Sequence, residues 1–263
     1  MQRQTPVFIV TSSRPRVGKT LIARALIEYF CALNRPVTAF DVNPDEFKLI
    51  DYLPAYTAAA SINDIRGEMA LFDQLVLPDR VPKIVDLSHT LLDKFFTLFQ
   101  KLDFAREAQR RGVSPMVLFV GDPDDRARQG YKMLMDRFPD LPLVPVLNEA
   151  IGQIERYGGN FPATRRGGPP VTIPSLSLVL RSVIEKREFS FLAYAAKTMD
   201  GTTELYGWIR RTFVTFRELE VRLLLGEMPK LPRAPTIPAI ARDDSVASLF
   251  GAPDKLSFLR GRR

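Results

Sequence analysis

Short apolar segments alternate with longer segments of helical periodicity from the N-terminus to about residue 174. The apolar segments that predict strands are 7–11, 37–41, 83–87, 116–120 and 143–147, with a sixth, short strand ending at Ile173 and Pro174. The segments whose apolar residues return every three or four positions are 20–33, 90–111 and 124–138. Successive parallel strands need crossover connections, which are usually helices. The alternation therefore predicts an α/β fold, a doubly wound and mostly parallel sheet with flanking helices.

The chain changes character after residue 175, where no further strand is predicted and helices are expected at 176–186, 189–198 and 203–225. The last of these helices has an apolar stripe made of Leu205, Ile209, Phe213, Phe216 and Leu223. Four arginines fall largely outside the stripe: Arg210, Arg211, Arg217 and Arg222. A solvated face of a packed helix and a surface that binds DNA or a protein partner both explain these arginines.

Prolines recur at every third position after Gly226, at Pro229, Pro232, Pro235 and Pro238. A spacing of three places them on one edge of a polyproline II helix, which has three residues per turn. The sequence therefore predicts a folded domain over residues 1–226 and a Pro-rich, flexible tail over residues 227–263.

Charge and cysteine content limit the classes of protein that fit. The chain has 37 Lys and Arg against 30 Asp and Glu, a net charge of +7 that suits a polyanionic partner but equally suits ordinary solubility. Cys31 is the single cysteine, so an intrachain disulfide is excluded and a reducing cytoplasm is expected. No apolar run approaches the roughly 20 residues of a membrane span, and membrane binding is therefore disfavoured.

A loop between the first predicted strand and the first predicted helix has the residues of a phosphate-binding loop. It ends in Gly18, Lys19 and Thr20. Glycine lets the backbone approach phosphates closely, lysine reaches the β- and γ-phosphate oxygens, and the threonine hydroxyl is a ligand for Mg²⁺. The N-terminus of the following helix favours anions. This arrangement predicts nucleotide binding.

With these residues in order along the chain, the sequence resembles the ParA/MinD family of ATPases, whose deviant Walker-type loop reads Lys-Gly-Gly-x-Gly-Lys-Thr. Asp41-Val42-Asn43-Pro44 is similar to the family's Asp-x-Asp-Pro segment, and Ile84-Val85-Asp86-Leu87 is similar to its Walker B strand. Asn148 and Pro174 match the positions that contact the adenine base. A weaker, pattern-level similarity extends to TraL-type conjugal transfer ATPases.

The resemblance implies a complete set of site residues. Those expected to contact ATP are Ser13, Arg14, Arg16, Val17, Gly18, Lys19, Thr20, Leu21, Asn148 and Pro174. Those expected around Mg²⁺ are Thr20, Asp41 and Asp86. It further implies a homodimer that forms on ATP binding, a protein partner or non-specific DNA, and a role in partitioning, positioning or transfer of DNA or cargo.

Three departures from the family pattern concern the residues expected to act in catalysis, Lys19, Asn43 and Arg14. Arg14 replaces the lysine that reaches across the family's dimer, which keeps the charge but changes its geometry. Pro15 and Arg16 replace two glycines, and proline removes a backbone donor. Asn43 replaces an aspartate, and an amide cannot act as a base. The sequence thus predicts nucleotide binding with slow or absent hydrolysis.

Two other functions remain open. Dethiobiotin synthetase-like ligases share the Val-Gly-Lys-Thr ending of the loop and use ATP with a small acid substrate. A scaffold that lost nucleotide binding through Pro15 and Arg16 would be a pseudo-ATPase.

Overall fold

The computed structural model describes residues 4–43, 48–198 and 201–226, which belong to a compact unit spanning Met1–Glu227. Within these three ranges, no helix combines the length and apolar character that crossing a membrane requires. The predicted Pro-rich tail and its polyproline helix lie outside the described residues and stay predictions.

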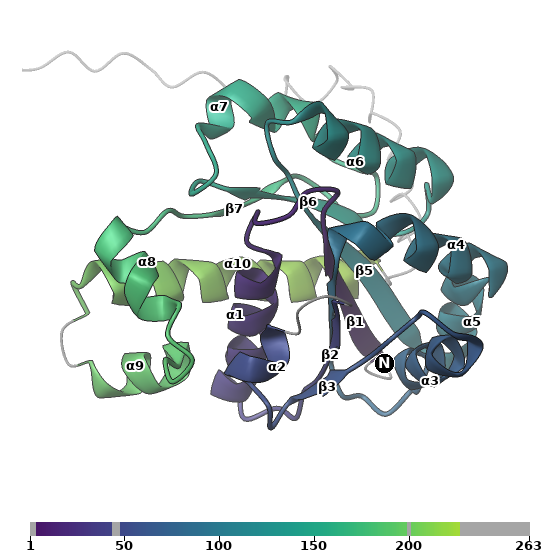
Figure 1. Ribbon diagram of the computed structural model, residues 1–263, viewed down its shortest axis with the longest axis horizontal. Helices are drawn as coiled ribbons and strands as arrows, with labels where there is room; N and C mark the ends of the chain where they lie inside the picture. Colours follow the sequence, from purple (N-terminus) through teal and green to yellow (C-terminus); the bar gives the residue numbers. More distant parts are fainter. Residues whose placement is uncertain (1–3, 44–47, 199–200, 227–263) are drawn as a thin grey trace, which may run out of the picture. The chain divides into compact units, whose positions relative to one another are not determined.

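Seven strands form one sheet in the order β3-β2-β4-β1-β5-β6-β7 (Figure 1). Their bounds are Thr5–Thr11 (β1), Thr38–Val42 (β2), Thr57–Ala59 (β3), Lys83–Leu87 (β4), Val113–Val120 (β5), Leu143–Asn148 (β6) and Val171–Ile173 (β7). Every neighbouring pair is parallel. Strands β2 to β4 lie on one side of β1 and β5 to β7 on the other, so the predicted doubly wound sheet is confirmed.

The six predicted strands are all present, and β3 is an additional edge strand. Its three residues, Thr57 to Ala59, include two exposed alanines, which have low strand propensity. Hydrogen bonding to β2 therefore determines its conformation, and the sequence contains no local signal for it.

Helices cover both faces of the sheet. One face carries α1 (Lys19–Ala32), α2 (Leu49–Tyr52), α8 (Leu178–Ile184), α9 (Phe191–Lys197) and α10 (Glu204–Gly226), and the other carries α3 (Ile65–Leu75), α4 (Leu92–Lys101), α5 (Phe104–Arg111) and α6 (Asp125–Arg137) (Figure 1). Shorter connections contain η1 (His89–Leu91), α7 (Ile154–Tyr157) and η2 (Gly158–Asn160). Side chains of β1 alternate between the two cores, with Val7 and Ile9 in one and Phe8 and Val10 in the other. Burial on both faces explains the continuous apolar strands.

The prediction of a single helix over 90–111 is wrong, because the chain bends at Leu102 and Asp103, between α4 and α5. Asp103 has a φ of 45°, in the left-handed region that ends a helix. The bend brings Phe104 back against Phe99 and Phe72, at ring-centroid distances of 4.9 and 5.4 Å. Burial of this aromatic cluster offsets the cost of the strained residue.

Helix α10 packs as its apolar stripe predicts. Leu205, Ile209, Phe216 and Leu223 are buried and Phe213 is partly buried. Trp208 is buried as well, and its Nε1 donates a hydrogen bond of 2.6 Å to the carbonyl of Pro174. This bond attaches α10 to the segment that follows β7, at the carboxyl end of the sheet.

Candidate nucleotide-binding site

The loop between β1 and α1 is held against the end of β6 by Asn148. The side-chain Nδ2 of Asn148 donates to the carbonyl of Val17 at 3.1 Å, and its Oδ1 accepts from the Ala150 amide. Gly18 has a φ of 94°, and a Cβ atom there would lie 2.7 Å from Asn148 Nδ2. Both the backbone conformation and the close approach therefore require glycine at this position.

Arg16 also has positive φ, at 58°, which is unusual for a residue with a side chain. It is exposed, as is Pro15 before it. Arg16 stands where the ParA/MinD loop pattern has glycine. The left-handed backbone explains the glycine in that pattern, because glycine adopts positive φ without steric cost. The two exposed residues form the outer part of the loop.

Lys19 and Thr20 begin α1 with their side chains directed to different partners. Lys19 Nζ donates to the carbonyl of Arg14 at 3.0 Å, which folds the lysine back over its own loop. Burial lowers the pKa of Lys19, and the nearby Asp86 carboxylate partly opposes this. The Thr20 hydroxyl donates to Asp86 Oδ2 at 2.6 Å and joins the first turn of α1 to β4.

Asp86 is a fully buried carboxylate with one oxygen unused. Its Oδ1 has no hydrogen-bond partner, and burial raises the pKa of the group to about 6, with a further increase from neighbouring Asp41. An unpartnered buried oxygen beside a threonine hydroxyl fits Mg²⁺, which prefers oxygen ligands and keeps several waters. Among the described residues, no group of three or more His, Cys, Asp or Glu side chains is arranged around a metal position. Phosphate and water oxygens would complete such a site.

Asp41 faces Asp86 across the β2–β4 pairing but already has partners on both oxygens. Asn43 Nδ2 donates to Asp41 Oδ1, and the amides of Leu49 and Ile50 donate to Oδ2 at 2.8 and 3.3 Å. Asp41 thus anchors the start of α2. Its role at Mg²⁺ stays a prediction, as does the catalytic role of Asn43.

Arg14 and Ser13 lie toward α6. Arg14 Nη2 is 3.5 Å from Asp124 Oδ2, and the same carboxylate caps α6 by accepting from the Arg126 amide. A Cβ on Gly130 of α6 would come within 1.7 Å of Ser13 Oγ, so glycine at 130 leaves room for the loop. Contact of Arg14 with a second protomer stays a prediction.

A cavity of about 850 Å³ opens above this loop. Of the predicted site residues, those that line it are Arg16, Gly18, Lys19, Thr20, Leu21, Asn43, Asn148 and Pro174. Val17, Asp41 and Asp86 are buried behind the cavity wall, and Ser13 and Arg14 lie outside the lining. Further walls come from Lys48 and Tyr52 near α2 and from Arg181 of α8. Its volume is in the range of small-molecule sites.

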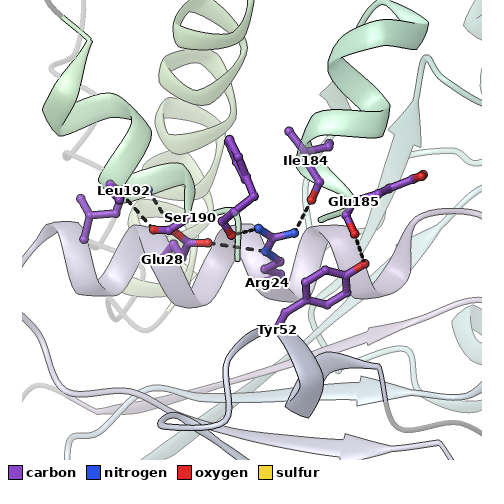
Figure 2. A network of polar contacts seen from close by, with 9 residues as sticks. Arg24, Glu28, Tyr52, Ile184, Glu185, Ser190 and Leu192 are labelled. Carbon is purple, nitrogen blue, oxygen red and sulfur yellow. Dashed lines mark hydrogen bonds and ion pairs between the residues drawn. The ribbon is translucent and has the colours of Figure 1, made fainter. Parts of the chain in front are cut away.

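The sequence did not identify Arg24, which also lines the cavity and is 2% exposed. Arg24 Nη1 donates to the carbonyl of Ile184 at 2.5 Å, and Nη2 donates to the carbonyl of Phe189. Its guanidinium lies 4.4 Å from the Tyr52 ring centroid. Figure 2 shows this side chain extending from α1, between Tyr52 of α2 and Ile184 at the end of α8.

Glu28 continues the Arg24 network one turn along α1. Its Oε1 is 3.6 Å from Arg24 Nε, and its Oε2 accepts from the Ser190 hydroxyl and the Leu192 amide at 2.6 and 2.8 Å (Figure 2). The spacing of Arg24 and Glu28 is visible in the sequence as an i, i+4 pair, which is usually a surface feature. Only the packing of α8 and α9 over α1 buries it.

The four arginines predicted to bind DNA or a partner differ in exposure. Arg222 is half-buried and donates to the carbonyls of Pro169 and Gly167, at 2.7 and 3.4 Å. Arg210, Arg211 and Arg217 are exposed. Arg222 thus binds backbone carbonyls of the loop before β7, and binding of DNA or a partner by the four arginines stays a prediction.

Replacing Arg16 by glycine is expected to raise the free energy of unfolding by about 0.5–1 kcal/mol, because glycine adopts the left-handed conformation without steric cost. Urea denaturation of wild type and Arg16→Gly measures the change. Arg16→Ala is the control, since it removes the same charge but keeps a Cβ, and it should give no gain. Equal stabilisation by both variants would contradict the backbone explanation.

Replacing Asp86 by asparagine is expected to stabilise the metal-free protein by roughly 1–2 kcal/mol at pH 7.5. The folded-state pKa of about 6 exceeds the ordinary pKa of aspartate. At a pH between these two pKa values, the folded protein therefore binds more protons than the unfolded protein. Wild-type stability therefore falls as pH rises toward 6 and stays lowered above it. Denaturation in a chelator at pH 7.5 and 4.5 tests this, with the gain expected to shrink at pH 4.5. Exposed Asp136→Asn is the control, and a destabilised Asp86→Asn at pH 7.5 would refute the prediction.

Comparison with known proteins supports the fold. A ParA family ATPase from Chlorobium tepidum TLS superposes with a TM-score of 0.51 at 12% identity over 81% of this chain and 99% of that chain. MinD, a cell division protein from Aquifex aeolicus, superposes with a TM-score of 0.50 at 14% identity, over 87% of this chain and 100% of MinD. For pnob8 ParA the TM-score is 0.50 at 11% identity, over 85% of this chain and 99% of that chain. Neither a protein-family model nor a curated protein sequence matches the chain. The predicted resemblance is confirmed at the level of structure: the chain has the α/β fold of the ParA and MinD ATPases.

Proposed function

We propose that this protein is an ATP-binding molecular switch of the ParA/MinD type. The observation that carries the proposal is the unpartnered Oδ1 of buried Asp86, which lies beside the Thr20 hydroxyl behind the phosphate loop. A buried carboxylate oxygen without a partner is costly, and such groups are retained at functional sites. ATP with Mg²⁺ is the ligand whose chemistry matches this arrangement.

Each part of the loop has a separate task in binding. The first amides of α1 have no partners within the helix, and they donate to phosphate oxygens. Lys19 exchanges the Arg14 carbonyl for a phosphate oxygen, which moves its charge from its own loop to the ligand. Thr20 and Asp86 hold the metal, which neutralises charge on the β- and γ-phosphates when bound. Asn148 and Pro174 border the base.

Slow hydrolysis is proposed because an amide, Asn43, stands where the ParA/MinD pattern has an aspartate. Asn43 lines the cavity, and its Nδ2 is bound to Asp41 Oδ1. The amide nitrogen donates and cannot accept a proton from an attacking water. Asn43 thus positions Asp41 while leaving the site without a base there.

Replacing Asn43 by aspartate is therefore expected to raise ATP turnover at least about ten-fold, since general bases contribute on the order of 10²–10⁴. Phosphate release under saturating ATP and Mg²⁺ measures the rate. Asn43→Ala, which loses the amide without adding a base, is the matched control and should not accelerate. Wild type that turns over ATP at least as fast as Asn43→Asp would show the interpretation of Asn43 to be wrong.

The biological role proposed is a nucleotide-dependent homodimer that acts in partitioning, positioning or transfer of DNA or cargo in the cytoplasm. Its support is the fold shared with a ParA family ATPase and with MinD, a cell division protein. Arg14 would contact the second protomer after leaving Asp124, a contact of 3.5 Å between half-exposed groups that costs little to break.

Sedimentation velocity with and without ATP and Mg²⁺ tests the switch. Wild type is expected to bind ATP and to dimerise. Lys19→Ala is expected to lower the affinity for ATP about 10- to 150-fold, because a hydrogen bond from a charged group contributes about 1.5–3 kcal/mol. Exposed Lys132→Ala is the control and should behave as wild type. Binding without dimerisation would favour a small-molecule ligase of the dethiobiotin synthetase type. No binding at all would favour a pseudo-ATPase.

A further inference from the structure

Helix α10 has a second, outer face that adjoins the stripe packed on the sheet, and Ile209, Phe213 and Leu223 of the stripe lie at the border between the two. A hollow of about 1050 Å³ lies along it, bordered by the C-terminal end of α1 and by residues near the starts of β1 and β5, such as Pro6 and Ser114. We call it the α10 groove. It lies at the amino ends of the strands, whereas the nucleotide cavity lies at their carboxyl ends. The proposed nucleotide switch does not use it.

The apolar wall of the α10 groove is exposed. Val214, Val221 and Leu224 of α10 are 56%, 44% and 52% exposed, and Leu33 from the end of α1 is 48% exposed. Single exposed apolar residues are ordinary, but a contiguous group along a hollow indicates an interaction surface. The ten-residue step from Val214 to Leu224 makes this wall roughly 15 Å long, because an α-helix rises about 1.5 Å per residue. This length matches about three turns of a helix lying in the groove.

Positive charge surrounds this wall. Arg80, Arg210 and Arg217 line the groove, and none of them forms an ion pair with a carboxylate among the residues that the structure describes. Glu220 also lines it, but its carboxylate is used by Arg35 at 2.5 Å and by the Tyr29 hydroxyl at 2.7 Å. The groove therefore presents three guanidinium groups without internal compensation.

Shape and charge together select the class of partner. DNA would satisfy the arginines but leave the valines and leucines against water or phosphate, and a flat bilayer cannot fill a concave hollow. A helix with apolar residues at i, i+3, i+4 and i+7 fits an apolar groove, and acidic residues on its flank complement the arginines. We propose that the α10 groove binds an acidic amphipathic helix of a protein partner.

The test uses random 16-residue peptides displayed on phage and selected against the full chain. Enriched peptides are expected to carry apolar residues at helical spacing together with Asp or Glu. Fluorescence anisotropy of the synthesised peptides then compares wild type with Val214→Asp and Arg217→Glu. Each substitution is expected to weaken binding about ten-fold or more, because it places a carboxylate at an apolar contact or reverses an attractive charge.

Val179→Asp is the matched control, because Val179 is 74% exposed on α8 and lies outside the groove. It should leave peptide affinity unchanged. Thermal unfolding confirms that each variant is folded, and Val214→Ser replaces Val214→Asp if the latter is not. A lysine placed at the acidic position of the peptide should restore binding to Arg217→Glu, which a general structural effect would not do.

Other occupants of the groove give different results. Enriched peptides that are basic, or whose affinity is insensitive to Val214 and Arg217, would overturn the proposal, as would selection without any enriched peptide. A 24-base-pair DNA duplex, phosphatidylserine vesicles and self-association are measured with the same variants. If Val214→Asp abolishes one of these interactions while peptide affinity is unchanged, that occupant replaces the acidic helix.

Discussion

The hydrogen bond from Thr20 to Asp86 is the interaction on which the candidate site depends. It connects the first turn of α1 to a central strand and so fixes where the phosphate loop begins its helix. Asp86 receives this bond on one oxygen and has the other free, in an environment from which water is excluded. The energetic cost of the buried charge is reflected in its raised pKa. A protein selected only for stability would not keep a free carboxylate oxygen there.

The other buried charges of α1 serve a different purpose. Arg24 and Glu28 bind backbone and hydroxyl groups at the end of α8 and the start of α9. Buried ion pairs contribute little net stability. In this chain their further hydrogen bonds link the helices after β7 to α1, the helix that follows the β1–α1 loop. The loop and the C-terminal helices are therefore joined through one helix, and Arg24 contributes to the cavity wall at the same time.

Helix α10 combines two surfaces of different character. The inner stripe is closed by packing and by the hydrogen bond of Trp208 to Pro174, near the nucleotide cavity. The outer face contains the α10 groove at the opposite ends of the strands. One long helix thus contacts the segment that borders one cavity and forms the wall of another. The arginines along α10 have different surroundings, since Arg222 binds backbone carbonyls before β7 and Arg217 lines the groove.

Local patterns in the sequence were sufficient for six of the seven strands, the stripe of α10 and the glycine of the loop between β1 and α1. Apolar runs and helical spacing depend on neighbouring residues, and Gly18 is required by the backbone turn that follows a strand. The bend at Asp103, the edge strand β3, the burial of Arg24 and the carbonyl contacts of Arg222 could not be predicted in this way. Each of them is stabilised by groups distant in the chain, such as Phe72 for the bend and Ile184 for Arg24. The sequence by itself therefore determined the class of fold and the need for glycine in the loop between β1 and α1. Only the tertiary structure decided which charges are buried, which are bound and which face solvent, because burial depends on the elements that pack together.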